Sequence, residues 1–184
     1  MNRQFRNTAL LICDLQTKTV RNLYYKHTVL ANVNTLLGMK PYLPHIKTCV
    51  AAQFIPEKLG GVCDSLHKEN IDRVYTKHTY TMLNDELVYH LEENAVTDII
   101  VTGMETQWCI NSTVMDLTSM NYTVYVPVDA IGNSVSNEQN QYNIESLRNN
   151  RAKLVTTDGL VCQNLRHADD IASKKYLEIL KQRS

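Results

Sequence analysis

Apolar and polar positions form a repeating pattern along this chain, in which a short apolar run is followed by a segment with helical spacing. Within the short runs the apolar residues are nearly continuous rather than alternating with polar ones. This pattern is typical of strands that are buried on both faces of a parallel sheet. It predicts strands at residues 8–15, 46–53, 72–77, 98–103, 122–129 and 152–158.

Segments with helical spacing lie between and after these strands. One of them begins with Asn84 and another with Ser136, and both residue types are favoured N-caps. The spacing predicts helices at residues 27–40, 84–95, 109–120, 136–150 and 168–182. The alternation of strands and helices predicts an α/β fold with a doubly wound sheet and right-handed crossovers. The long irregular connection at residues 53–71 is expected to line a site.

The composition is that of one ordinary globular domain. The chain has 184 residues, of which 43% are hydrophobic, and this length suits a single domain over residues 1–184. Lysine and arginine together number 19, as do aspartate and glutamate, so the formal net charge is zero. A balanced charge gives no general attraction to nucleic acid or to an anionic membrane. No apolar stretch approaches the ~20 residues that span a bilayer, so neither a nucleic acid nor a membrane is an expected partner.

The cysteines and histidines indicate the compartment and the absence of a metal. The five cysteines are odd in number and form no C-x-x-C pair, which argues against a disulfide framework or a structural zinc site and fits a reducing compartment. We therefore expect a cytoplasmic location, while the lack of acidic residues before Asp14 leaves a mitochondrial location as the alternative. The histidines form no H-x-H or H-E-x-x-H group, and no G-x-G-x-x-G or P-loop occurs, so no metal or other cofactor is expected.

Three chemically useful side chains lie at the ends of predicted strands or just after them: Asp14, Lys77 and Cys109. Ligands of open α/β sheets bind beyond the carboxyl ends of the strands, so we expect the three to share one pocket. There a helix N-terminus and Lys77 would hold Cys109 as a thiolate, with a thiol pKa below the ordinary value of about 8.5. Asp14 would accept the thiol proton and return it to a leaving amine, while N–H groups of residues 104–109 hold the oxyanion. These parts suit hydrolysis of an amide-like bond through a thioester.

Each of these residues also has an ordinary structural interpretation. A cysteine between a strand and a helix is often a small buried hydrophobe, and an aspartate after a strand often caps the next helix. Lys77 fits a solvated charge at a strand end. Of the other cysteines, Cys13 and Cys49 are expected in the core and Cys63 in an exposed loop. From the residues alone, a catalyst and an inert α/β domain therefore both remain open.

Three segments resemble the signature segments of the isochorismatase-like cysteine hydrolases, namely "LLICDLQ" (10–16), "TKHTYTM" (76–82) and "VTGMETQWCINSTVMDL" (101–117). The segments "AAQFIPEKLG" and "VDAIGNS" also match in place and character, so the resemblance covers most of the chain in matching order. It implies a single isochorismatase-like hydrolase domain with a three-layer, Rossmann-like α/β fold. The sheet would then have six mainly parallel strands in the order 3-2-1-4-5-6, with helices on both faces.

The same resemblance implies roles for individual residues. It implies a catalytic triad in which Asp14 is the acid/base, Lys77 the lysine and Cys109 the nucleophile. It also implies a cis peptide bond between Met104 and Glu105, an oxyanion hole formed by the N–H groups of Glu105 and Cys109, and assembly into homo-oligomers. Side chains beside these motifs are expected either to contact the substrate or to pack at the rim of the sheet: Gln53, Phe54, Tyr80 and Trp108.

Two departures from the superfamily argue against two of its known reactions. Its nicotinamidases bind a metal through a D-x-H motif after the second strand, and "AAQFIPEKLGG" contains no such motif. True isochorismatases cleave a vinyl ether without a cysteine nucleophile, so Cys109 argues against that reaction. The sequence therefore predicts a metal-independent cysteine hydrolase that cleaves the C–N bond of a small amide substrate through a thioester. The alternatives are a catalytically silent small-molecule-binding or scaffolding protein and RNA cleavage, which the neutral charge disfavours.

Overall fold

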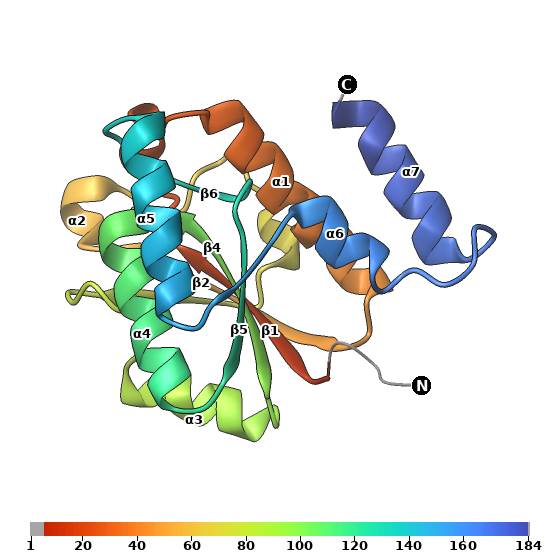
Figure 1. Ribbon diagram of the computed structural model, residues 1–184, viewed down its shortest axis with the longest axis horizontal. Helices are drawn as coiled ribbons and strands as arrows, with labels where there is room; N and C mark the ends of the chain where they lie inside the picture. Colours follow the sequence, from red (N-terminus) through yellow and green to blue (C-terminus); the bar gives the residue numbers. More distant parts are fainter. Residues whose placement is uncertain (1–5, 184) are drawn as a thin grey trace.

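A parallel β-sheet forms the centre of the computed structural model, which describes residues 6–183 (Figure 1). Its strands are β1 (Thr8–Cys13), β2 (Ile46–Phe54), β3 (Arg73–Lys77), β4 (Asp98–Met104), β5 (Thr123–Pro127), β6 (Ile131–Gly132) and β7 (Lys153–Val155). The pairings between these strands are all parallel, and the main path runs β3-β2-β1-β4-β5-β7. The predicted order is confirmed, with β7 in the sixth place because the two-residue β6 lies off this path and pairs with β4.

Helices cover both faces of the sheet (Figure 1). They are α1 (Lys26–Met39), α2 (Pro56–Leu59), α3 (Asp85–Glu93), α4 (Asn111–Ser119), α5 (Asn137–Asn149), α6 (Thr157–Cys162) and α7 (Ile171–Arg183). Short 3₁₀ turns occur at Thr19–Arg21, Lys40–Tyr42 and Lys68–Asn70, and a π-helical turn at Thr106–Ile110. None of the helices within residues 6–183 is both long enough and apolar enough to cross a membrane.

Two separate apolar cores confirm the three layers. One core contains the buried residues of α1, α6 and α7, and the other contains those of α3, α4 and α5. Strand β1 supplies both, because Leu10 and Ile12 belong to the first core while Leu11 and Cys13 belong to the second. Successive strand residues point to opposite faces, so a strand that serves two cores must be apolar throughout. This requirement explains the continuous apolar runs in the sequence.

Both predicted N-caps are confirmed. The side chain of Asn84 accepts a hydrogen bond from the Leu87 N–H at 2.8 Å, and Ser136 Oγ accepts one from the Gln139 N–H at 3.1 Å. Each satisfies an N–H group that has no partner inside its helix, which stabilises a helix by about 1 kcal/mol.

The structure differs from the predicted elements in several places: β6, α6 and the short helix α2 inside the segment expected to be irregular were not predicted, and several boundaries shift. The predicted strand at 152–158 ends at Val155, because Thr156 caps α6 by accepting a hydrogen bond from the Gly159 N–H at 3.0 Å. The predicted helix at 109–120 is α4 preceded by the π-helical turn, so Cys109 lies in that turn rather than in the α-helix. At the first of these two boundaries, a local cap overrides the apolar pattern.

The carboxyl ends of β1 and β4 lie unusually close together. Cys13 pairs with Gly103, whose φ is 110°, and a Cβ on Gly103 would lie 2.1 Å from the Cys13 carbonyl oxygen. Only glycine fits such a conformation and such a contact. From this point the chain leaves β1 toward β2 on one side and β4 toward β5 on the other, which is where ligands bind in doubly wound sheets.

Candidate functional site

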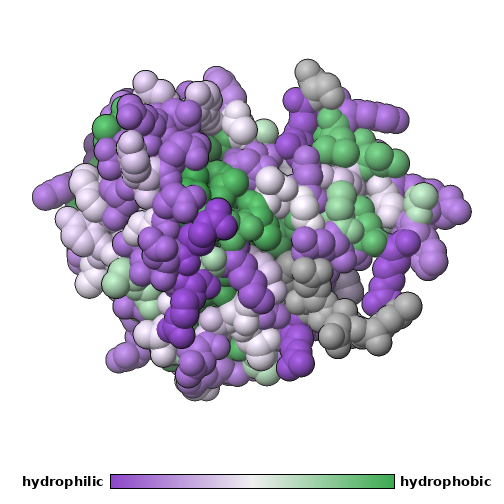
Figure 2. Space-filling model, viewed as in Figure 1, coloured by the Kyte–Doolittle hydropathy of each residue, from purple (hydrophilic) through white to green (hydrophobic). Residues whose placement is uncertain are grey.

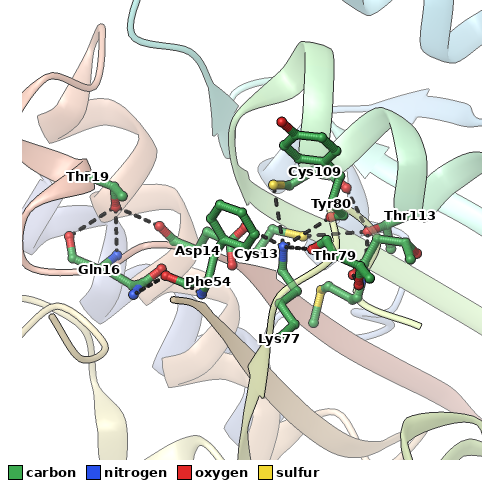
Figure 3. A network of polar contacts seen from close by, with 12 residues as sticks. Cys13, Asp14, Gln16, Thr19, Phe54, Lys77, Thr79, Tyr80, Cys109 and Thr113 are labelled. Atoms are coloured by element: carbon green, nitrogen blue, oxygen red, sulfur yellow. Dashed lines mark hydrogen bonds and ion pairs between the residues drawn. The ribbon is translucent and has the colours of Figure 1, made fainter. Parts of the chain in front are cut away.

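The three side chains predicted to converge do so at this edge of the sheet (Figure 3). Lys77, the last residue of β3, places its Nζ 2.8 Å from Asp14 Oδ2 and donates a hydrogen bond to Cys109 Sγ at 3.4 Å. Asp14 follows β1, and Cys109 follows β4 within the π-helical turn. All three are buried, with 4–5% of each residue exposed. We call Asp14, Lys77 and Cys109 the triad.

The Lys77 ammonium is fixed by several partners at once. Besides its two triad partners, Nζ donates to the carbonyl oxygens of Thr79 at 3.1 Å and Tyr80 at 3.0 Å. It also lies 4.8 Å from the centroid of the Phe54 ring, within the range of a cation–π interaction. Burial lowers the pKa of Lys77, but the acidic groups that face it outweigh burial and leave this pKa raised. Lys77 therefore stays charged.

The Asp14 carboxylate is poorly solvated for a charged group. The backbone of Asp14 has a left-handed φ of 50°, a conformation that aspartate tolerates better than most residues. Although Lys77 lies close, neither carboxylate oxygen has a hydrogen-bond donor in good geometry within residues 6–183. Burial raises the pKa of Asp14, and the Lys77 charge offsets only part of this effect. Asp14 is thus a stronger base than an exposed aspartate.

The prediction that Cys109 is held as a thiolate in the resting protein is wrong. Burial and then the nearby Asp14 carboxylate raise the pKa of Cys109 to about 12, and Lys77 lowers it only in part. Desolvation of the sulfur outweighs the helix N-terminus and Lys77, the two features on which the predicted thiolate rested. Cys109 therefore keeps its proton at neutral pH, and a base must remove that proton when the sulfur attacks. Cys63, expected in an exposed loop, is buried, whereas Cys162 is exposed.

The turn between β4 and α4 has the predicted backbone. The Met104–Glu105 peptide bond is cis, as the resemblance implied. The Glu105 side chain holds this turn, because its Oε2 accepts hydrogen bonds from the Ser134 N–H at 3.0 Å and from Gln107 Nε2 at 3.1 Å. The oxyanion-hole role of the Glu105 and Cys109 N–H groups stays a prediction.

Three of the four predicted substrate neighbours form a row of aromatic rings beside the triad. The Phe54 and Tyr80 rings are stacked with centroids 5.9 Å apart, and Tyr80 lies 6.3 Å from Trp108. Tyr80 and Trp108 are 56% and 54% exposed, so the row leads from Lys77 to the surface. Gln53, at the end of β2, pairs with Thr76 of β3. Contact of these four residues with a substrate stays a prediction.

Gln16, a fully buried amide two residues after Asp14, was not predicted as part of the site. Its Nε2 donates to the carbonyl oxygens of Phe54 at 3.1 Å and Gly60 at 2.6 Å, and its Oε1 accepts from the Phe54 N–H at 2.8 Å. Gln16 therefore ties the chain after β1 to the chain after β2 (Figure 3). A polar residue closing the apolar segment "LLICDLQ" was the available signal.

A cavity of about 550 Å³ lies apart from the triad, at the same edge of the sheet. It is bounded by the start of α1, one side of α5 and the ends of β5 and β7, and we call it the α1–α5 cavity. Hydrophobic residues gather between α5 and α6 on this face (Figure 2). Its floor is apolar and its rim carries amides, Glu145 and Arg148, while no triad residue lines it. Within residues 6–183 no three His, Cys, Asp or Glu side chains are grouped as a metal site.

Comparison with known proteins identifies relatives over the whole length. A family model described as "Isochorismatase domain" matches residues 42–159. The chain is 28% identical over 183 residues to isochorismatase family protein 1B of Dictyostelium discoideum, covering 96% of this chain and 87% of that protein.

Solved structures share the fold at lower identity. A structure of MAR1 ribonuclease from Caenorhabditis elegans superposes with a TM-score of 0.85 at 22% identity, covering 98% of this chain and 92% of that one. YcaC from Pseudomonas aeruginosa, in a structure with hexane-2,5-diol and covalent acrylamide, superposes with a TM-score of 0.80 at 17% identity, covering 97% and 90%. At these identities the likeness establishes a common fold.

Proposed function

This chain belongs to the isochorismatase family, and we propose that it is a metal-independent cysteine hydrolase that cleaves the C–N bond of a small amide. The observation that carries this proposal is the contact of one ammonium with both a carboxylate and a thiol, at 2.8 Å and 3.4 Å. Nucleophile, base and electrostatic stabiliser then lie within reach of one carbonyl group.

The first half of the reaction forms a thioester. Asp14 takes the Cys109 proton as the sulfur attacks the amide carbon, and the carbonyl oxygen becomes an oxyanion to which the N–H groups of Glu105 and Cys109 donate hydrogen bonds. Asp14 then returns that proton to the amide nitrogen as the C–N bond breaks. An amine or ammonia leaves, and the acyl group remains on Cys109.

The second half regenerates the enzyme. Asp14 takes a proton from a water molecule, whose oxygen attacks the thioester carbon. The C–S bond breaks, the sulfur regains the proton, and a carboxylic acid leaves. The net reaction is amide plus water to carboxylic acid plus amine. Throughout, Lys77 stays charged and stabilises whichever of Asp14 and Cys109 is anionic.

The protonation states of the triad support attack assisted by a general base. A thiol with a pKa of about 12 is a poor nucleophile until it loses its proton, and Asp14, whose own pKa is raised, is the base that we propose for this proton. The covalent acrylamide in the YcaC structure adds support from another protein of this fold, because acrylamide alkylates thiols.

A panel of small amides, assayed for ammonia release, tests the proposal. We expect the wild-type protein to release ammonia from at least one amide, and Cys109→Ala to release none. The control Cys162→Ser removes the exposed cysteine and is expected to keep full activity. Intact mass spectrometry after mixing is expected to show an acyl adduct that Cys109→Ala lacks.

A binding or scaffolding protein is the outcome that would replace this proposal. If no amide releases ammonia and no adduct forms, while a small molecule raises the melting temperature, the triad serves binding instead. RNA cleavage is a further alternative, because the C. elegans relative of the same fold is called a ribonuclease. A ribonuclease assay with Cys109→Ala as the control separates the two activities.

A further inference from the structure

We propose that Thr113 is a positioning residue for the triad, because its one hydroxyl contacts the nucleophile's backbone, the turn that holds Lys77 and the residue before Asp14. This inference rests on the proposed function. Thr113 lies in α4, four residues after Cys109, and is fully buried. It touches no substrate and acts through other groups.

The hydroxyl uses its whole hydrogen-bonding capacity. Oγ1 donates to the Cys109 carbonyl oxygen at 2.6 Å and accepts from the Met82 N–H at 3.0 Å. The Cys13 thiol lies 3.8 Å from it. A hydroxyl has one proton and two lone pairs, so with its proton committed to Cys109 it accepts from both Met82 and Cys13.

These contacts join three segments that are distant in the sequence (Figure 3). Met82 closes the turn whose Thr79 and Tyr80 carbonyl oxygens accept hydrogen bonds from Lys77. The acceptors of the ammonium and the backbone of the nucleophile are thus both attached to Thr113. We expect the 3.4 Å distance from Lys77 to Cys109 to depend on this hydroxyl.

The bond to Cys109 alone would be unremarkable. Threonine hydroxyls in helices often donate to the carbonyl four residues earlier. Thr35 in α1 does so, at 2.9 Å to the Ala31 oxygen, and is also buried. Within the described residues, however, Thr35 makes no hydrogen bond outside its helix. The bond from Met82, 31 residues away, distinguishes Thr113.

Three variants isolate the hydroxyl: Thr113→Val removes it at nearly constant shape, Thr113→Ser keeps it, and Thr35→Val makes the same change away from the triad. The readout is the rate at which iodoacetamide alkylates Cys109 between pH 7 and 11, followed by peptide mass spectrometry. In Thr113→Val the sulfur loses the Lys77 charge, so we expect alkylation at pH 9 to be about tenfold slower. Thr113→Ser and Thr35→Val are expected to stay within about threefold of the wild type.

Two results would overturn the proposal. In one, Thr113→Val melts at a lower temperature but keeps the wild-type pH profile of alkylation, which assigns the hydroxyl a structural role only. In the other, alkylation becomes faster, which means that the hydroxyl merely keeps the site closed. Alkylation needs no turnover, so this test decides even if no amide is hydrolysed. Once a hydrolysed amide is known, Thr113→Val is expected to lower kcat about a hundredfold with KM unchanged.

Discussion

The triad and the α1–α5 cavity lie at the same edge of the same sheet, yet they place ionisable side chains in opposite surroundings. In the triad, Lys77 and Asp14 form an ion pair whose side chains are 4% and 5% exposed. At the cavity, Arg148 and Glu145 form a pair at 3.3 Å whose side chains are 61% and 64% exposed. Water therefore reaches most of the Arg148–Glu145 pair and very little of the Lys77–Asp14 pair.

This contrast supports the proposal that the triad, rather than the α1–α5 cavity, is the reactive site. The cavity has room for a small molecule, at about 550 Å³, but its Arg148–Glu145 pair is exposed and interacts weakly. The triad is buried, and burial raises the pKa of both Asp14 and Cys109. Strongly perturbed pKa values next to a specific charge partner mark functional sites. Desolvation of ionisable side chains is therefore a better indicator of a reactive site than the volume of a cavity.

The largest expected effect tests whether the substrate reacts at the triad or binds in the α1–α5 cavity. Cys109→Ala should lower amide hydrolysis by about 10⁴-fold, because the nucleophile is gone. Gln141→Ala, at the rim of the α1–α5 cavity, should leave kcat and KM within about twofold. Steady-state kinetics on the amide identified by the ammonia assay provide the measurement. A large loss of activity in Gln141→Ala would place the substrate in the cavity instead.

The next effect concerns the pH dependence of the thiol. With a pKa of about 12, Cys109 should be alkylated by iodoacetamide about tenfold faster for each pH unit up to about pH 11. In the urea-unfolded chain, the ordinary thiol pKa of about 8.5 should make the rate level off near pH 9.5. At pH 8 the folded protein should thus react about a thousandfold more slowly. A plateau below pH 9 in the folded protein would mean a preformed thiolate.

The third effect is on stability. Lys77→Met should lower the free energy of unfolding at pH 7 by about 3–5 kcal/mol, because it leaves the Asp14 carboxylate buried without its partner. The pKa of Asp14 is raised in the folded protein, so its protonated form favours folding below about pH 4, and this contribution disappears as the pH rises through the folded value. The deficit of Lys77→Met should therefore shrink toward acid pH, as urea unfolding at pH 7 and pH 4 would measure.

A double variant is the control for this third effect. Asp14→Asn combined with Lys77→Met removes both charges at similar volume, and it should be at least as stable as the wild type at pH 7. If the double variant were as unstable as Lys77→Met alone, lost packing rather than an unpaired charge would be the cause.

The smallest expected effect is on the free energy of unfolding when the exposed Arg148–Glu145 ion pair is broken. Glu145→Gln should change the free energy of unfolding by no more than about 0.5 kcal/mol, since exposed ion pairs contribute little. Urea unfolding at low and high salt would measure it. A change of more than about 2 kcal/mol would show that the two regions differ less than their exposure indicates.

Much of the fold and part of the site could be predicted from the sequence. The strand runs are continuous because each central strand serves two cores, and the caps at Asn84 and Ser136 are local hydrogen bonds, so both leave a trace in the sequence. The convergence of Asp14, Lys77 and Cys109 followed from parallel strands sharing one carboxyl edge. Gln16 and Thr113 were missed because their importance lies in partners 31 to 44 residues away.

By itself, then, the sequence determined the layers and the three residues that meet at the edge of the sheet, since hydrophobic periodicity and motif order are properties of the chain, and its resemblance to a known family implied the strand order. Only the tertiary structure decided the protonation state of Cys109, because the pKa of a group depends on how much water its neighbours exclude and on which charges they bring. Those neighbours come from β1, β3 and the turn after β4, and no local pattern records how closely they pack.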